Sequence, residues 1–193
     1  MNPNEFSIWF KSNSQRLARI EASQAAHEIG ARLAQVDERF SVEVADIGGG
    51  ARELIVGASR EKSLFRLVEA LCAELSDLAN WNVQALKPAR GFDFELQCGD
   101  CVIRASDLRF EPLHTDEMPG ELGLRFFAPE DVVPAVSDVA WLMLETGIGE
   151  RGAADVAHVD VVPLPPEHHD LLSLDALQSY LTWATRRGGP ASS

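Results

Sequence analysis

The sequence has few of the features that mark secreted, membrane-bound or disulfide-stabilised proteins. It has only three cysteines in 193 residues, an odd number too small for a disulfide framework. No stretch approaches the roughly 20 consecutive apolar residues of a membrane helix. The first five residues contain no basic region followed by an apolar core, so we expect no signal peptide. These absences predict a cytoplasmic protein, and the net charge of −13 argues against an anionic membrane as a partner.

Positive charge is also scarce. The chain has 17 Lys and Arg against 30 Asp and Glu, a net charge of −13, which argues against nucleic acid as a partner. Between Asp107 and Asp175 there are 15 acidic residues against three arginines. Acidic surface of this kind keeps chains apart in solution. It can also attract a basic protein or a cationic ligand, and both interpretations stay open.

Common catalytic and cofactor-binding motifs are missing. There is no His-Glu-x-x-His, no Gly-x-Ser-x-Gly and no Gly-x-Gly-x-x-Gly. The glycine cluster Gly48–Gly50 is followed by a strand pattern rather than by a helix, so it predicts a turn and not a phosphate-binding loop. We therefore expect no bound cofactor and no resident metal.

The clearest folding unit runs from Phe40 to Pro88. Apolar and polar residues alternate on both sides of the glycine cluster, which predicts two strands joined as a hairpin. Ser59 is the expected N-cap of an amphipathic helix whose apolar stripe runs from Leu64 to Leu78. A further strand is expected from Trp81 up to Pro88.

Helical and strand patterns also alternate outside this unit. We expect a short helix ending near Ser12–Ser14, a second one from Ser14 to about Gln35, a buried helix from Val132 to Leu144 and a final helix from Leu174. Strands are expected over 92–96, 102–105, 108–110, 122–126 and 158–164. The sequence therefore predicts one α+β domain over residues 1–188, with a largely antiparallel sheet, N-terminal helices and further helices packed on it. Residues 189–193 are expected to form a disordered tail.

Cys98 and Cys101 have the spacing of redox and zinc-binding pairs. Redox pairs usually lie where a strand passes into a helix, but here both flanking segments alternate as strands. The intervening Gly99-Asp100 suits a two-residue hairpin turn. A zinc site would need further ligands, such as His168 and His169, brought close by the fold. We interpret the pair as the two ends of a hairpin turn.

Several polar clusters and one tryptophan are candidates for a binding site. Trp183 follows Tyr180 in the last helix and could anchor a partner. Loops on a rigid scaffold commonly carry binding residues. The expected partner-binding residues are Asp116, Glu117, Glu167, His168, His169, Asp170 and Trp183.

Four segments resemble those of a loose group of uncharacterised bacterial α+β proteins. They are the Trp-Phe-x-x-Asn start at Trp9–Asn13, the strand Arg52–Ser59, the strand Asn80–Pro88 and the Gly149-Glu150 pair after a buried helix. The resemblance covers much of the chain. It implies a fold but no activity and no catalytic residues.

Two functions follow from these observations as hypotheses. The first is a non-enzymatic cytoplasmic protein that binds a basic protein through an acidic surface, as an inhibitor or immunity-type protein would. The alternative is a small hydrolase that uses carboxylates and histidine, with or without metal. A pocket in which His114, His158 or His168 meets acidic side chains would favour the enzyme, and an acidic face without a cleft would favour binding.

Overall fold

The computed structural model describes residues 1–99, 101–113 and 122–188. Its helices and mostly antiparallel strand pairs confirm the predicted α+β class. The chain forms two compact units, Met1–Lys87 and Pro88–Ser193, where the sequence predicted one domain over residues 1–188. The predicted tail, 189–193, lies outside the described residues.

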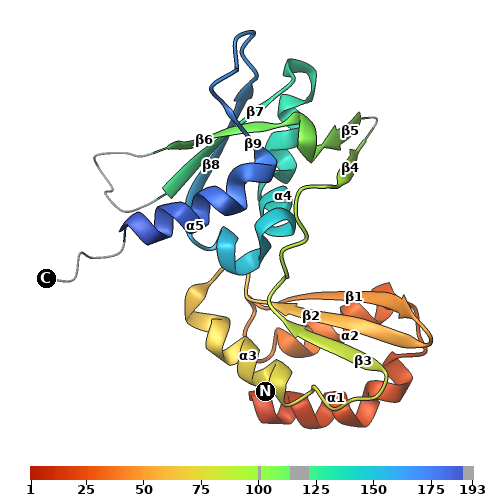
Figure 1. Cartoon of the computed structure of the whole chain (residues 1–193). Helices are drawn as coiled ribbons and strands as arrows, with labels where there is room; N and C mark the ends of the chain where they lie inside the picture. The colour runs from red at the N-terminus through yellow and green to blue at the C-terminus, as the bar shows by residue number, and fades with distance from the viewer. Residues whose placement is uncertain (100, 114–121, 189–193) are drawn as a thin grey trace, which may run out of the picture. The chain divides into compact units, whose positions relative to one another are not determined.

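The first unit is a three-stranded sheet with helices on one face (Figure 1). Strands β1 and β2 are antiparallel, and β3 is parallel to β2 because helix α3 connects the two. The elements are α1 (Pro3–Leu17), α2 (Ala22–Leu33), β1 (Ser41–Gly48), β2 (Ala51–Gly57), the 3-10 turn η1 (Lys62–Leu64), α3 (Phe65–Ala73) and β3 (Trp81–Ala85).

The predicted hairpin around the glycine cluster is confirmed. Val42 lies opposite Val56, and Val44 lies opposite Leu54. Gly48, Gly49 and Gly50 all have positive φ, between 63° and 87°. Glycine adopts this backbone conformation without a steric penalty, so the turn follows from the local sequence.

The predicted helix break at Ser12–Ser14 is wrong, because α1 continues to Leu17. Each polar side chain in this segment bonds back to a carbonyl of its own helix. The Ser12 hydroxyl donates to the Ile8 carbonyl at 2.9 Å, the Asn13 amide to Trp9 at 2.9 Å and the Ser14 hydroxyl to Lys11 at 2.9 Å. These bonds leave the backbone helical, so residues that often start helices lie inside one here.

The predicted N-cap at Ser59 is also wrong. Ser59 has φ 50°, and its hydroxyl donates to the carbonyl of Arg39 at 2.8 Å. Glu61 caps the following 3-10 turn instead, since its carboxylate accepts from the backbone N–H of Ser63 at 3.3 Å. The helix itself begins at Phe65.

A buried arginine on β2 ties the sheet to the end of α1. The guanidinium of Arg52 donates through Nη1 to the carbonyl of Leu17 at 3.0 Å and through Nη2 to the carbonyl of Ile20. Its Nε lies 2.9 Å from Oδ1 of Asp46 on β1, outside hydrogen-bond geometry, so that contact is electrostatic. Leu17 is the last residue of α1, and its carbonyl has no partner within the helix.

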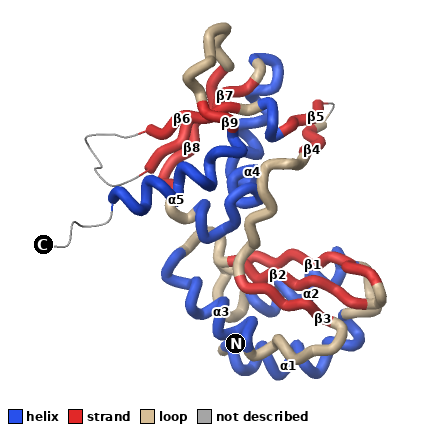
Figure 2. The backbone as a smooth tube through the Cα atoms, in the orientation of Figure 1, coloured by secondary structure: helices blue, strands red, loops and turns tan. Residues whose placement is uncertain are grey.

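The second unit divides its strands between two sheets, coloured red in Figure 2. One is the β4–β5 hairpin, and the other has the order β8-β7-β6-β9. Its elements are β4 (Glu95–Cys98), β5 (Cys101–Arg104), η2 (Ala105–Asp107), β6 (Arg109–Leu113), β7 (Leu122–Ala128), η3 (Glu130–Val132), α4 (Val133–Ala153), β8 (Val156–Pro163), β9 (Leu172–Ser173), η4 (Leu174–Ala176) and α5 (Leu177–Gly188).

Helix α4 is interrupted near its end by a glycine. Gly149 has φ 76° and ψ 161°, a conformation that is open almost only to glycine. Because this residue breaks the helical hydrogen-bond pattern, the carbonyls before it can accept other donors. The Thr146 carbonyl accepts from the N–H of Arg90 at 2.8 Å, and the Gly147 carbonyl accepts from the N–H of Gly91 at 3.0 Å. The break therefore allows the segment after residue 88 to form hydrogen bonds with α4.

The strand predicted from Phe92 begins only at Glu95. Phe92 instead packs against α4, where its ring occupies the position that a side chain on Gly147 would take. Phe92 is 5% exposed, and its ring stacks with that of Phe94 at a centroid distance of 6.3 Å. In this alternating segment Phe92 therefore packs against α4, and strand pairing begins only at Glu95.

By length and composition, the helical segment Glu130–Ala153 could cross a membrane, whereas the sequence predicted no membrane helix. In the structure, 44% of its apolar window is buried, and α4 packs on β8 and β7. A core helix of a soluble protein meets the same criteria.

Candidate functional site

Three charged side chains form a row across the larger sheet of the second unit. Glu111 on β6 is the register partner of Arg125 on β7, which is the partner of Asp160 on β8. The Arg125 guanidinium donates from Nε to Oδ2 of Asp160 at 2.9 Å and from Nη1 to Oε1 of Glu111 at 3.3 Å. All three side chains are about one-third exposed, at 36–38%. The row carries one net negative charge.

The row lies on the face of the sheet that points away from the helices. Successive strand residues point to opposite faces, and the neighbouring row is Phe110, Phe126 and Val161. Phe110 and Phe126 are fully buried, and the ring of Tyr180 on α5 meets Phe110 at a centroid distance of 5.8 Å. Helix packing on one face therefore leaves the charged row accessible on the other. This row could not be predicted from the sequence, because its members come from three strands whose register the sequence does not give.

The loop between β8 and β9 carries four of the predicted site residues and extends beyond the sheet in Figure 1. Glu167, His169 and Asp170 are exposed, as predicted for a loop, and His168 is half-buried. Nδ1 of His168 lies 3.0 Å from the carbonyl of Pro165. The rings of His168 and His169 are nearly parallel, at 24°, with centroids 6.0 Å apart.

Trp183 lies on α5, and half of its surface is exposed. Its ring contacts that of Tyr180 at a centroid distance of 5.7 Å, and Tyr180 contacts the buried Phe110. This series of rings connects the exposed tryptophan to the core of the unit. The other two predicted site residues, Asp116 and Glu117, lie outside the described residues.

The net charge of the chain is concentrated in the second unit. Residues 1–87 contain 12 acidic and 10 basic residues, a net charge of −2, whereas residues 88–193 contain 18 and 7, a net charge of −11. Exposed carboxylates in the described part of this unit include Asp93, Glu95, Asp107, Asp155, Glu167 and Asp170. The excess of acid is therefore a property of one unit.

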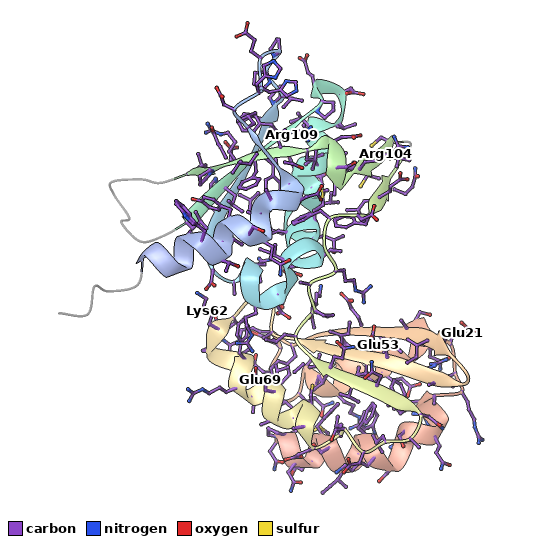
Figure 3. All side chains as sticks on the ribbon, viewed as in Figure 1. Glu21, Glu53, Lys62, Glu69, Arg104 and Arg109 are labelled. Atoms are coloured by element: carbon purple, nitrogen blue, oxygen red, sulfur yellow. The ribbon has the colours of Figure 1, made fainter. Side chains whose placement is uncertain are left out.

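A shallow depression of about 280 Å³ opens beside the β4–β5 hairpin. Figure 3 labels Arg104 on this hairpin and Arg109 at the start of β6. Nε of Arg104 donates to Oε1 of Glu95 at 2.6 Å on the rim. The depression is lined by Phe92, Asp93, Phe94, Glu95, Arg104 and Ser106. None of the histidines that the structure describes lines it, so among these residues it does not bring histidine and carboxylates together as the hydrolase hypothesis requires.

His158 is exposed on the same face of the sheet as Asp160. The carboxylate of Asp160 is already paired with Arg125. His114 lies outside the described residues. Within residues 1–99, 101–113 and 122–188, no three His, Cys, Asp or Glu side chains come close enough to hold a metal ion.

The hairpin interpretation of Cys98 and Cys101 is confirmed. The two residues face each other at the end of the β4–β5 pair, and Gly99 in the turn has φ 58°. Both cysteines are free and half-buried. The third cysteine, Cys72, is buried on α3, and its thiol lies 3.6 Å from the carbonyl of Gln84.

We expect Cys98 and Cys101, but not Cys72, to react with iodoacetamide in the native protein at about pH 8. Burial raises the pKa of the Cys72 thiol to about 12. Its thiolate fraction at that pH is then on the order of one in ten thousand. Peptide mass mapping after a short reaction would show the difference. Labelling of Cys72 as fast as Cys98 would contradict it, and denatured protein, in which all three thiols react, provides the control.

No protein-family model matches the chain, and no curated protein matches it. The resemblance to the bacterial α+β group therefore stays a prediction.

Proposed function

We propose that this chain is a non-enzymatic cytoplasmic protein that binds a basic protein through the acidic surface of its second unit, in the manner of an inhibitor or immunity protein. The observation that carries the proposal is the distribution of charge, with −11 in residues 88–193 against −2 in residues 1–87. Acid spread over the surface for solubility alone has no reason to collect in one unit. Complementary charge increases the association rate and selects a partner of opposite sign.

The charged row supplies a preorganised part of this surface. Arg125 holds Glu111 and Asp160 in defined positions, so these carboxylates lose little side-chain entropy when a partner binds. An arginine or lysine of a basic partner can approach either carboxylate from the open face of the sheet. Glu167 and Asp170 add exposed negative charge on the loop that follows β8.

Trp183 provides an aromatic contact in the same unit. Tryptophan is enriched among the residues that contribute most to binding at protein interfaces. The ring of Trp183 packs on that of Tyr180, which in turn contacts the buried ring of Phe110. Replacing Trp183 with alanine would remove this contact while leaving the charge of the surface unchanged.

The test is capture of the partner followed by measured binding. Tagged protein would be incubated with lysate of the cells that express it and washed at low and then high salt, and the retained proteins would be identified. We expect one basic protein at near-equal stoichiometry whose retention falls as salt rises. In titration calorimetry, the Glu167→Lys/Asp170→Lys variant should bind this partner about 10-fold or more weakly at low salt.

A matched control carries the same charge change on the first unit. Glu74 and Asp77 are exposed, and a Glu74→Lys/Asp77→Lys variant should bind within about twofold of the unaltered protein. If no protein is retained at either salt, or if both variants weaken binding equally, the acidic surface of the second unit is not the binding site.

A further inference from the structure

Cys98 and Cys101 are placed to react with each other. They are register partners across the tip of the β4–β5 hairpin, so their side chains leave the sheet on the same side. Directly opposite residues in antiparallel strands have Cα atoms about 4.5–5.5 Å apart, within the range of about 4.4–6.8 Å that disulfides span. The Cys101 sulfur already lies 3.0 Å from the carbonyl oxygen of Cys98.

Both cysteines are partly exposed in the folded hairpin. Each is half-buried, in contrast to the buried Cys72. Cys98 packs on the core of the second unit together with Phe94 and Leu96, which fixes one side of the pair. Cys101 follows the turn, and the exposed Val102 comes next on the same strand.

We propose that Cys98 and Cys101 form a reversible dithiol–disulfide site that exchanges with low-molecular-weight disulfides such as glutathione disulfide. One thiolate attacks a sulfur of the small disulfide, which forms a mixed disulfide and releases one small thiol. The second cysteine then attacks the protein sulfur of the mixed disulfide and releases the second small thiol. The protein loses two electrons and two protons, and the small disulfide gains them as two thiols.

Closing the bond joins β4 to β5 at the tip of the hairpin. The next pairs toward its base are Gln97 with Val102 and Leu96 with Ile103. Ile103 is 2% exposed and belongs to the core of the unit. The site therefore lies at the outer end of a hairpin whose base is anchored in the core, where a covalent bond can form with little displacement of the rest.

The experiment equilibrates the full chain with glutathione buffers of increasing oxidised-to-reduced ratio. Free thiols are then trapped with iodoacetamide, and intact and peptide masses are measured. We expect most of the protein to lose two hydrogens in the peptide that contains Cys98 and Cys101 at high ratios, and dithiothreitol to reverse the change. Cys72→Ala should behave in the same way, because Cys72 takes no part in the exchange.

The single variants distinguish ring closure from simple glutathione attachment. In Cys98→Ser and Cys101→Ser, the remaining thiol has no partner, so a stable glutathione adduct should replace the two-hydrogen loss. The unaltered protein decides the outcome even if a variant does not fold. The proposal is wrong if both cysteines stay alkylatable at every ratio, if the adduct persists in the unaltered protein, or if the bond links two chains.

Discussion

Gly147→Ala is expected to lower the free energy of unfolding of the second unit by about 2–4 kcal/mol. A β-carbon on Gly147 would lie 2.1 Å from Cε1 and Cζ of Phe92, closer than carbon atoms can approach. Phe92 is 5% exposed, so its ring cannot move aside without leaving its packed position. The helix must shift or the ring must leave its position, and either change disturbs the packing between α4 and the segment before β4.

Native-state hydrogen exchange measures this effect for one unit at a time, which global melting of a two-unit chain does not. Peptides of α4 and β8 should exchange about 30-fold faster or more in Gly147→Ala, whereas peptides of the first unit should keep their rates. In the double variant Gly147→Ala/Phe92→Ala, the free energy of unfolding should fall by less than the sum of the decreases in the two single variants. The reason is that the ring and the new methyl group no longer collide.

Gly152→Ala is the matched control in the same helix. Its β-carbon would lie 3.4 Å from the nearest atoms of Ile148, an ordinary contact distance. Alanine is favoured over glycine within a helix by about 0.5–1 kcal/mol, so this variant should be neutral or slightly more stable. Equal destabilisation by both substitutions would show that the Phe92 contact is not the cause.

Arg52→Met is expected to destabilise the first unit by about 2–4 kcal/mol. Methionine keeps part of the volume of the side chain but leaves the carbonyls of Leu17 and Ile20 without their donor. Arg52→Lys should recover only part of the loss, because one ammonium group does not reproduce the fork that reaches both carbonyls. Hydrogen exchange in peptides of α1 and β2 would measure the change.

The ion pair between Arg52 and Asp46 can be compared with the contacts of Arg52 to the two carbonyl groups. Asp46 is 67% exposed, whereas the side chain of Arg52 is 8% exposed. Because Asp46 is mostly exposed to solvent, the ion pair should add little to the stability of the unit. Asp46→Ala should therefore lower the free energy of unfolding by at most about 1 kcal/mol. If Asp46→Ala costs as much as Arg52→Met, the ion pair rather than the carbonyl contacts stabilises this end of α1.

The proposed binding surface could be predicted only in part. The exposure of Glu167, His169 and Asp170 follows from their proline-bounded loop, and the structure agrees. Glu111 and Asp160 were counted as part of the acidic stretch, but nothing in the local sequence shows that both meet Arg125. That contact requires the β6–β7 and β7–β8 registers together.

The sequence by itself determined the features whose physical causes lie within a few residues. Alternation and glycine at positive φ specify the β1–β2 turn, and the same rules place Cys98 opposite Cys101. Tertiary structure decided the features that depend on distant partners. These are the division into two units, the parallel pairs β2–β3 and β7–β8, the burial of Arg52 and the break in α4 that receives Arg90 and Gly91. The reason is that backbone preference acts locally, whereas register, burial and the partners of carbonyl groups depend on which segments meet in the folded chain.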